Sequence, residues 1–224
     1  MGNGFDDFGK IIIDQANVLA KEIEHLSGKN SRPVVAAIDG ASGSGKSSFA
    51  QLLCCKLQAG IIPLDDFFSA DIPDDQWDTF SVTEKLERVF DWNRVRALAL
   101  EPLRKELRAK WRPFDFLAGI QQDGTYPMAS EEKILNPSNI VLLEGSYSSC
   151  HFLEDLIDFK LLINVPVEER HKRLSLRDDP AFLERWHKRW DAVETYYFEH
   201  VRPKEYFDWV INNPALQSRP QAGA

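Results

Sequence analysis

The sequence is short of cysteine and has no long apolar run. Three cysteines, an odd number with no Cys-x-x-Cys pair, occur among 224 residues, which argues against a disulfide scaffold and favours a reducing compartment. No apolar run approaches the roughly 20 residues that cross a bilayer, and residues 1–10 lack the basic and apolar regions of a signal peptide. We therefore expect a cytoplasmic protein without a membrane partner.

Positive charge is also scarce: 27 basic residues face 35 acidic ones, which leaves a net charge of −8. Broad binding to nucleic acid needs a positive field that neutralises phosphates, so we expect a small-molecule partner and no nucleic acid. The length suits one substantial core and is too short for two ordinary domains. We expect residues 1–224 to form one domain, and the sequence leaves a homo-oligomer open.

Short apolar runs alternate with amphipathic segments, the order typical of an α/β fold with a parallel sheet flanked by helices. Strands are predicted at Pro33–Asp39, Gly60–Leu64, Ile140–Glu144, Phe159–Val165 and Phe207–Ile211. Helices are predicted at Ile11–Leu26, Lys46–Leu57, Val167–Asp178 and Phe182–His200. Residues 217–224 are expected to fray.

Two regions of the pattern are less regular. Residues 83–110 are predicted to be mostly helical, with an interruption at Glu101-Pro102 because proline disfavours helix at the residue before it. Aromatic residues and an Asp-Gly pair predict a hairpin or an irregular excursion at Arg112–Pro127. The tryptophans are expected mainly in the core, and the histidines show no zinc-type spacing.

A phosphate-binding loop is the most specific signal in the chain. Residues 40–47 read Gly-Ala-Ser-Gly-Ser-Gly-Lys-Ser, which matches G-x-x-x-x-G-K-[ST] between a predicted strand and a predicted helix. Such a loop turns its N–H groups toward phosphates, its lysine bridges the outer phosphates, and its last serine holds Mg²⁺. The expected ATP-binding residues are Gly40, Ala41, Ser42, Gly43, Ser44, Gly45, Lys46, Ser47 and Ser48.

Carboxylates follow two of the other predicted strands. Asp65 and Asp66 come after the second strand, and Glu144 ends the strand that begins at Ile140. Ligands of open α/β sheets bind beyond the carboxyl ends of the strands, so these acids are expected near the phosphate loop. An aspartate there can act as the base that accepts the proton of an attacking hydroxyl. Glu144 can bind Mg²⁺ directly or through water, and a capping role is the alternative.

A basic cluster lies between Arg170 and Arg189 of this otherwise acidic chain. Arg173 and Arg177 are four residues apart and would share one helical face. Cations that close over a moving phosphate stabilise phosphoryl transfer. On composition alone, a solvated helix that pairs with nearby acids is the stronger interpretation.

Together these segments resemble the uridine kinase-like family of P-loop kinases, whose relatives include nicotinamide riboside kinase, pantothenate kinase and phosphoribulokinase. The resemblance covers about residues 34–211. The run Leu-Asp-Asp-Phe-Phe at 64–68 looks like the family's D-[SD]-F-[YF] segment, which implies that Asp65 is the catalytic base. The strand end at Glu144 is similar to the family's Mg²⁺-associated strand, so Ser47, Glu144 and Asp65 are the expected metal residues.

The resemblance also implies an acceptor site and a lid. Phe90-Asp91 looks like the pair whose acid holds ribose hydroxyls, and Arg112–Phe116 resembles the segment that sets an aromatic ring, here Phe114, against the base. Phe68 is expected beside the substrate. Arg170–Asp178 looks like the family's lid, roughly residues 167–190, in which Arg173 and Arg177 match arginines near the phosphates.

The chain departs from uridine–cytidine kinases in three places. No histidine follows the aromatic segment, Phe114 replaces a tyrosine, and the acidic stretch 71–83 has no clear counterpart. A site that lacks these hydrogen-bonding groups would discriminate bases poorly.

The sequence thus predicts an ATP- and Mg²⁺-dependent kinase of the P-loop NTPase fold, in which Asp65, Lys46, Arg173 and Arg177 act on the transferred phosphate. A nucleoside is the leading acceptor, and a riboside vitamin, pantothenate or a sugar phosphate is the alternative. A nucleotide-dependent switch is the alternative outside enzymes, but no Asn-Lys-x-Asp segment for guanine occurs.

Overall fold

The computed structural model describes residues 4–213, with side chains from residue 12 onward. Within this range, five parallel strands form a sheet in the order β2-β5-β1-β6-β7. They are β1 (Val34–Asp39), β2 (Gly60–Pro63), β5 (Ile140–Glu144), β6 (Phe159–Asn164) and β7 (Trp209–Asn212). The five strand predictions are confirmed. The expected fraying at 217–224 lies outside the described residues.

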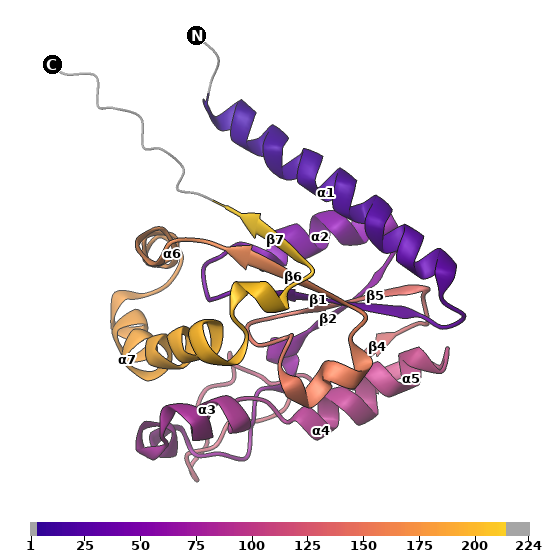
Figure 1. The fold of residues 1–224 in the computed structure, drawn as a ribbon. Helices are drawn as coiled ribbons and strands as arrows, with labels where there is room; N and C mark the ends of the chain where they lie inside the picture. The colour runs from indigo at the N-terminus through magenta and orange to yellow at the C-terminus, as the bar shows by residue number, and fades with distance from the viewer. Residues whose placement is uncertain (1–3, 214–224) are drawn as a thin grey trace, which may run out of the picture.

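Helices cover both faces of the sheet (Figure 1). The α-helices are α1 (Gly4–Lys29), α2 (Lys46–Leu57), α3 (Val82–Arg88), α4 (Trp92–Arg94), α5 (Glu101–Arg104), α6 (Val167–Ser175) and α7 (Pro180–Tyr196). In the part of the chain that the structure describes, no helix is both long enough and apolar enough to cross a membrane.

The central strand β1 joins two hydrophobic cores. Its successive side chains point to opposite faces of the sheet. Ala36 and Ile38 pack in the core under α1 and α2, whereas Val35 and Ala37 belong to the core that includes the α3–α5 segment and α7. All of β1 is buried, as expected of a strand inside a parallel sheet. The two cores therefore fix the place from which the glycine-rich loop emerges.

The predicted helix interruption at Glu101-Pro102 is wrong. The chain stays helical from α4 through a π-helical segment (Val95–Leu100) into α5, where Pro102 lies in the first turn. The π-helical turns change the hydrogen-bond register just before the proline. The helix breaks earlier instead, at Phe90, which bridges Phe68, and at Asp91, which caps α4 by accepting the Arg94 N–H at 3.0 Å.

The end of that predicted helix is a strand. β3 (Ala109–Trp111) pairs antiparallel with β4 (Lys133–Leu135). A tertiary contact explains why these residues are a strand and not the predicted helix, since the Trp111 indole donates to the buried Asp66 carboxylate at 2.8 Å. Between the two strands the chain is irregular apart from a bridge between Phe114 and Met128. The predicted irregular excursion is confirmed.

The acidic stretch 71–83 docks onto α7. Its 3₁₀ helix (Asp74–Thr79) carries two carboxylates that bind Arg189 of α7, with distances of 2.8 Å from Nη1 to Asp74 and 3.0 Å from Nε to Asp78. Between them Trp77 is fully buried, and its ring centroid lies 5.3 Å from that of Trp190. The stretch therefore fixes α7 beside the aromatic core.

Candidate active site

The loop between β1 and α2 presents open backbone donors. Within the described residues, no protein acceptor is bound by the N–H groups of Gly43, Gly45 and Lys46. Gly45 precedes α2 in the left-handed conformation, with φ of 89°, and no side chain caps this helix. Unpaired N–H groups and the positive end of the helix dipole both favour an anion. The local geometry therefore suits a phosphate.

A buried ion pair from α6 and α7 supports the loop from the side. Arg170 donates from Nη1 to the Ser42 carbonyl at 3.1 Å and to Glu194 at 2.9 Å, while Glu194 accepts the Ser42 N–H at 2.7 Å. A Cβ at Gly43 would lie 2.8 Å from the Arg170 carbonyl oxygen, so glycine is required where α6 meets the loop. The sequence analysis missed Glu194, because no local pattern pairs it with a loop 152 residues away.

Asp39, the last residue of β1, is a second support that the sequence analysis missed. Its carboxylate accepts the N–H groups of Gly40, Tyr147 and Ser149 at 2.8–2.9 Å and the Tyr197 hydroxyl at 2.8 Å. Burial raises the pKa of Asp39, while these hydrogen bonds act in the opposite direction. The residue ties the start of the loop to the segment after β5, and its position just before the glycine motif was its one sequence signal.

The three side chains predicted to bind Mg²⁺ lie at one edge of the sheet. β1, β2 and β5 end in register there, and the Ser47 hydroxyl donates to Glu144 at 3.0 Å. Burial raises the pKa of Glu144, Lys46 opposes that shift, and the nearby Asp65 adds to it. One hydroxyl and two carboxylates form an oxygen-only set, which is the set that Mg²⁺ prefers. The residues present therefore fit the ion.

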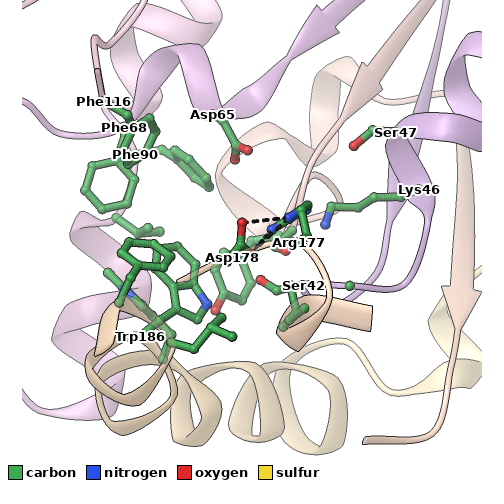
Figure 2. Close-up of a pocket in the computed structure, with 18 residues that line it drawn as sticks. Ser42, Lys46, Ser47, Asp65, Phe68, Phe90, Phe116, Arg177, Asp178 and Trp186 are labelled. Carbon is green, nitrogen blue, oxygen red and sulfur yellow. Dashed lines mark hydrogen bonds and ion pairs between the residues drawn. The ribbon is translucent and has the colours of Figure 1, made fainter. Parts of the chain in front are cut away.

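A pocket of about 160 Å³ opens beside these residues. Figure 2 shows its polar end, with Lys46, Ser47 and Asp65, and its aromatic end, with Phe116 and Trp186. Trp186 packs against the core, as expected, and also lines the pocket wall. The arrangement sets a carboxylate between the phosphate loop and a surface on which a flat molecule can stack.

Asp65 and Asp66 have different surroundings. Asp65 faces the pocket, where desolvation raises its pKa and the charge of Lys46 lowers it. Asp66 is buried and accepts from the Trp111 indole and from the Lys133 ammonium, both at 2.8 Å. The first carboxylate is available for chemistry, and the second holds the β3–β4 excursion against the sheet.

The two arginines matched to the lid differ in position. Arg177 lines the pocket, bonds to Asp178 and interacts electrostatically with Asp65. Arg173 donates from Nη1 to the Ser44 carbonyl at 3.3 Å, so it contacts the backbone of the loop. α6 ends at residue 175, which makes the predicted helix to residue 178 too long. The chain turns after residue 175, and Arg177 and Asp178 line the pocket.

The aromatic end of the pocket corresponds only in part to expectation. Phe68 lines it, and of the two phenylalanines at positions 114 and 116 only Phe116, which is 46% exposed, lies on its wall. Phe114 is 6% exposed, and its ring centroid lies 5.1 Å from that of Phe68. The family resemblance favoured Phe114 over Phe116, whereas side-chain packing decides which ring faces the pocket.

A second cavity of about 280 Å³ continues from this end. Both cavities share the walls formed by Phe68, Phe116, Phe182, Trp186 and Trp190. Phe114 and the guanidinium-bearing residues Arg185 and Arg189 line only the second cavity. The aromatic surface therefore extends into the second cavity, whose walls also carry Arg185 and the Arg189–Asp74 ion pair.

The structure does not bring Asp91 to this pocket. Its carboxylate caps α4, and it lines a separate cavity together with Arg94 and Trp111. The role predicted for Asp91 at ribose hydroxyls stays a prediction.

Comparisons with known proteins find that the chain is similar to kinases. No family model matches the sequence. A uridine kinase of Clostridium tetani is 25% identical over 195 residues, which cover 80% of this chain and 87% of that protein. A uridine kinase of Ureaplasma parvum serovar 3 is 24% identical over 151 residues, covering 65% and 69%.

Two solved structures have the same fold. One, described as a possible uridine kinase from Bacillus stearothermophilus, superposes with a TM-score of 0.62 at 20% identity, covering 89% of this chain and 98% of that one. The D-glycerate 3-kinase of Cryptococcus neoformans gives 0.59 at 15% identity, covering 91% and 96%. These two structures show the fold, and the uridine kinases matched by sequence indicate a phosphotransferase. The predicted resemblance to the uridine kinase-like P-loop kinases is thus confirmed, and the chain has the α/β fold of the P-loop NTPases.

Proposed function

We propose that the protein is an ATP-dependent kinase that transfers the γ-phosphate to a hydroxyl of a small molecule, with a nucleoside as the leading acceptor. The observation that carries this proposal is the position of Asp65. Its carboxylate faces a pocket with Lys46 of the phosphate loop on one side and aromatic rings on the other. An acceptor stacked on those rings would present its hydroxyl to the carboxylate.

In the proposed reaction, the acceptor oxygen attacks the γ-phosphorus and its proton passes to Asp65. The bond from the γ-phosphorus to the bridging oxygen breaks, and ADP takes that electron pair. Lys46 and Arg177 stabilise the charge that spreads over the phosphate oxygens. Ser47, Glu144 and Asp65 would hold Mg²⁺, which neutralises phosphate charge when it is bound.

A nucleoside is favoured as acceptor because the pocket walls are flat and aromatic. Phe68, Phe116 and Trp186 can stack on a base whatever hydrogen-bonding groups its edge carries. A smaller alcohol that bears an anion is the second candidate. Arg185 on the wall of the adjoining cavity favours it, and the solved relatives with this fold include a D-glycerate kinase.

The direct test is a phosphoryl-transfer screen over nucleosides, nicotinamide riboside, pantothenate, glycerate and sugar phosphates. We expect nucleosides to give the highest kcat/KM. Turnover of an anionic alcohol alone would favour the second candidate as acceptor. Nucleotide binding without phosphoryl transfer to any acceptor would favour a nucleotide-dependent switch.

Phe116→Ala is expected to raise the nucleoside KM about tenfold with little change in kcat, because stacking on an aromatic side chain is worth roughly 1–3 kcal/mol. Steady-state kinetics on two nucleosides with different bases measures the effect, which is expected for both. Leu117→Ala is the matched control, since Leu117 is 99% exposed and does not line the pocket. An unchanged KM for Phe116→Ala would remove the ring from the acceptor site.

The activity is expected to fall in acid as Asp65 becomes protonated. A base must be deprotonated to work, and desolvation places the pKa of Asp65 above its ordinary value of 3.8. The acid limb of kcat/KM should therefore lie at a higher pH than that of an ordinary aspartate. A pH profile measured under conditions in which the protein stays folded tests this, and a flat profile down to pH 4 contradicts the role of Asp65.

Other expectations stay predictions. Residues 1–224 as one domain, a lid over about 167–190, a cytoplasmic location and a homo-oligomer require separate measurements. For Asp91, the relevant comparison is the preference for ribosides over 2′-deoxyribosides in the wild type and in Asp91→Ala.

A further inference from the structure

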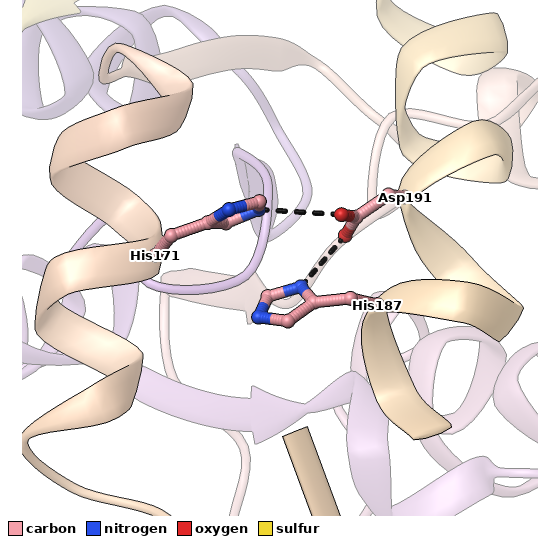
Figure 3. Close-up of side chains that lie close together, drawn as sticks. All are labelled: His171, His187 and Asp191. Atoms are coloured by element: carbon pink, nitrogen blue, oxygen red, sulfur yellow. Dashed lines mark hydrogen bonds and ion pairs between the residues drawn. The ribbon is translucent and has the colours of Figure 1, made fainter. Parts of the chain in front are cut away.

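Two histidines and an aspartate meet between α6 and α7. His171 lies on α6, while His187 and Asp191 lie four residues apart on α7 (Figure 3). His171 Nε2 is 3.3 Å from one carboxylate oxygen of Asp191, and His187 Nδ1 is 3.0 Å from the other. The imidazole centroids are 4.0 Å apart. The sequence analysis found no metal-type spacing among the histidines, because the cluster forms only when the two helices pack together.

The distances in this cluster suit a bound transition metal. Donor atoms that share a tetrahedral ion at bond lengths of about 2.0–2.1 Å lie roughly 3.3 Å from one another. The contacts of the two histidines to Asp191, each to a different carboxylate oxygen, are close to that value. One ligand atom from each of the three residues lies within 4.8 Å of the other two.

The environment leaves the cluster accessible and one donor unsatisfied. The side chains of His171, His187 and Asp191 are 36%, 24% and 37% exposed, so an ion could enter from solvent. His171 Nε2 is itself buried and makes no hydrogen bond within the described residues. The neighbouring charges of Arg170 and Glu194 are paired with each other, which leaves the Asp191 carboxylate as the charge in the cluster.

We propose that His171, His187 and Asp191 form a binding site for a divalent transition metal ion of the zinc class, which ties α6 to α7. Two imidazole nitrogens and one carboxylate suit such an ion. This donor set differs from the oxygen-only set at the phosphate loop, which suits Mg²⁺.

A bound ion would act on the support of the phosphate loop. His171 directly follows Arg170, whose side chain and carbonyl both contact the loop. On α7, Asp191 precedes Glu194 by less than one helical turn, and Glu194 accepts the Ser42 N–H. Linking His171 to Asp191 through a metal therefore stabilises the contact between the two helices and the loop, whatever acceptor the enzyme uses.

The test is a titration of the chelator-treated full-length protein with Co²⁺, in excess Mg²⁺ so that the oxygen-only site is occupied. We expect one equivalent of Co²⁺ to bind with the visible absorption of a low-coordinate nitrogen–oxygen site, and Zn²⁺ to displace it. His187→Gln and Asp191→Asn should each weaken binding by at least about tenfold, since the loss of an outer-shell partner alone costs roughly 10–100-fold.

Two controls separate this site from other donors. His25→Gln removes an exposed histidine on α1, and Cys55→Ser removes an exposed free thiol; neither should change the titration. Circular dichroism verifies that each variant is folded, and His171→Gln provides a third ligand variant if one of the others unfolds. Three results would overturn the proposal: no stoichiometric binding, equal binding in the ligand variants, or a signal that disappears with Cys55→Ser. In that case the cluster is only two imidazoles packed beside Asp191, with one hydrogen bond between His187 and that carboxylate.

Discussion

Lys46→Ala is expected to fold normally and to lower kcat by roughly 10²–10³-fold or more. Losses of this size are typical when a preorganised group that stabilises the transition state is removed. Lys46 lines the pocket and is the positive charge that lowers the pKa values of both Asp65 and Glu144. Its loss removes stabilisation of the phosphate and makes both carboxylates easier to protonate. Single-turnover kinetics measure the loss of activity, and a thermal melt checks that the variant is folded.

The same variant also tests the direction in which Lys46 shifts the pKa of Asp65. Without Lys46 the pKa of Asp65 rises further, so the acid limb of the residual activity should move to higher pH. Lys56→Ala is the matched control, because Lys56 lies at the far end of the same helix and bonds to Asn17 of α1. Wild-type activity in a folded Lys46→Ala protein would reject the phosphate-loop mechanism.

Asp65→Asn and Asp66→Asn are expected to fail in different ways. Asp65→Asn removes the base and should lower kcat by roughly 10²–10⁴-fold while stability and nucleotide binding are largely kept. Asp66→Asn should retain most of kcat but lower the free energy of unfolding by about 1–3 kcal/mol. The reason is that the buried Asp66 carboxylate accepts from Trp111 and Lys133, and an amide offers only one acceptor oxygen to these two donors.

Kinetics at saturating ATP and urea unfolding of both variants separate the two roles. Asp75→Asn serves as the control, since Asp75 is an exposed aspartate in the nearby acidic stretch 71–83. Equal losses of kcat at positions 65 and 66 would point to a shared metal-binding role. The reverse order would assign the base to Asp66.

Sequence predicted the fold well wherever the signal is local. Strand and helix periodicity and the glycine pattern depend on residues close together in the chain, which is why β1, the loop and α2 were correctly placed. Prediction failed where a distant contact overrides local preference. Residues 109–111 form a strand because Trp111 reaches Asp66, 45 residues away. The error at residues 101–104 has a local cause instead, since Pro102 lies in the first turn of α5, where a proline is tolerated.

The candidate site divides in the same way. The sequence by itself determined the chemistry available: a phosphate loop with Lys46 and Ser47, and carboxylates at the ends of two strands. The carboxyl ends of parallel strands lie at one edge of the sheet, so the sequence also predicted that Asp65 and Glu144 lie near the loop. Nothing beyond residue type and strand order was needed for that inference.

Only the tertiary structure decided which member of each similar pair faces the pocket. Asp65 and Asp66, or Phe114 and Phe116, are equivalent by residue type, and packing distinguishes them. It also decided the partners that no spacing could reveal, such as Glu194 at the Ser42 N–H. The physical reason is that such contacts depend on how helices pack on the sheet, because residues far apart in the chain meet only through that packing.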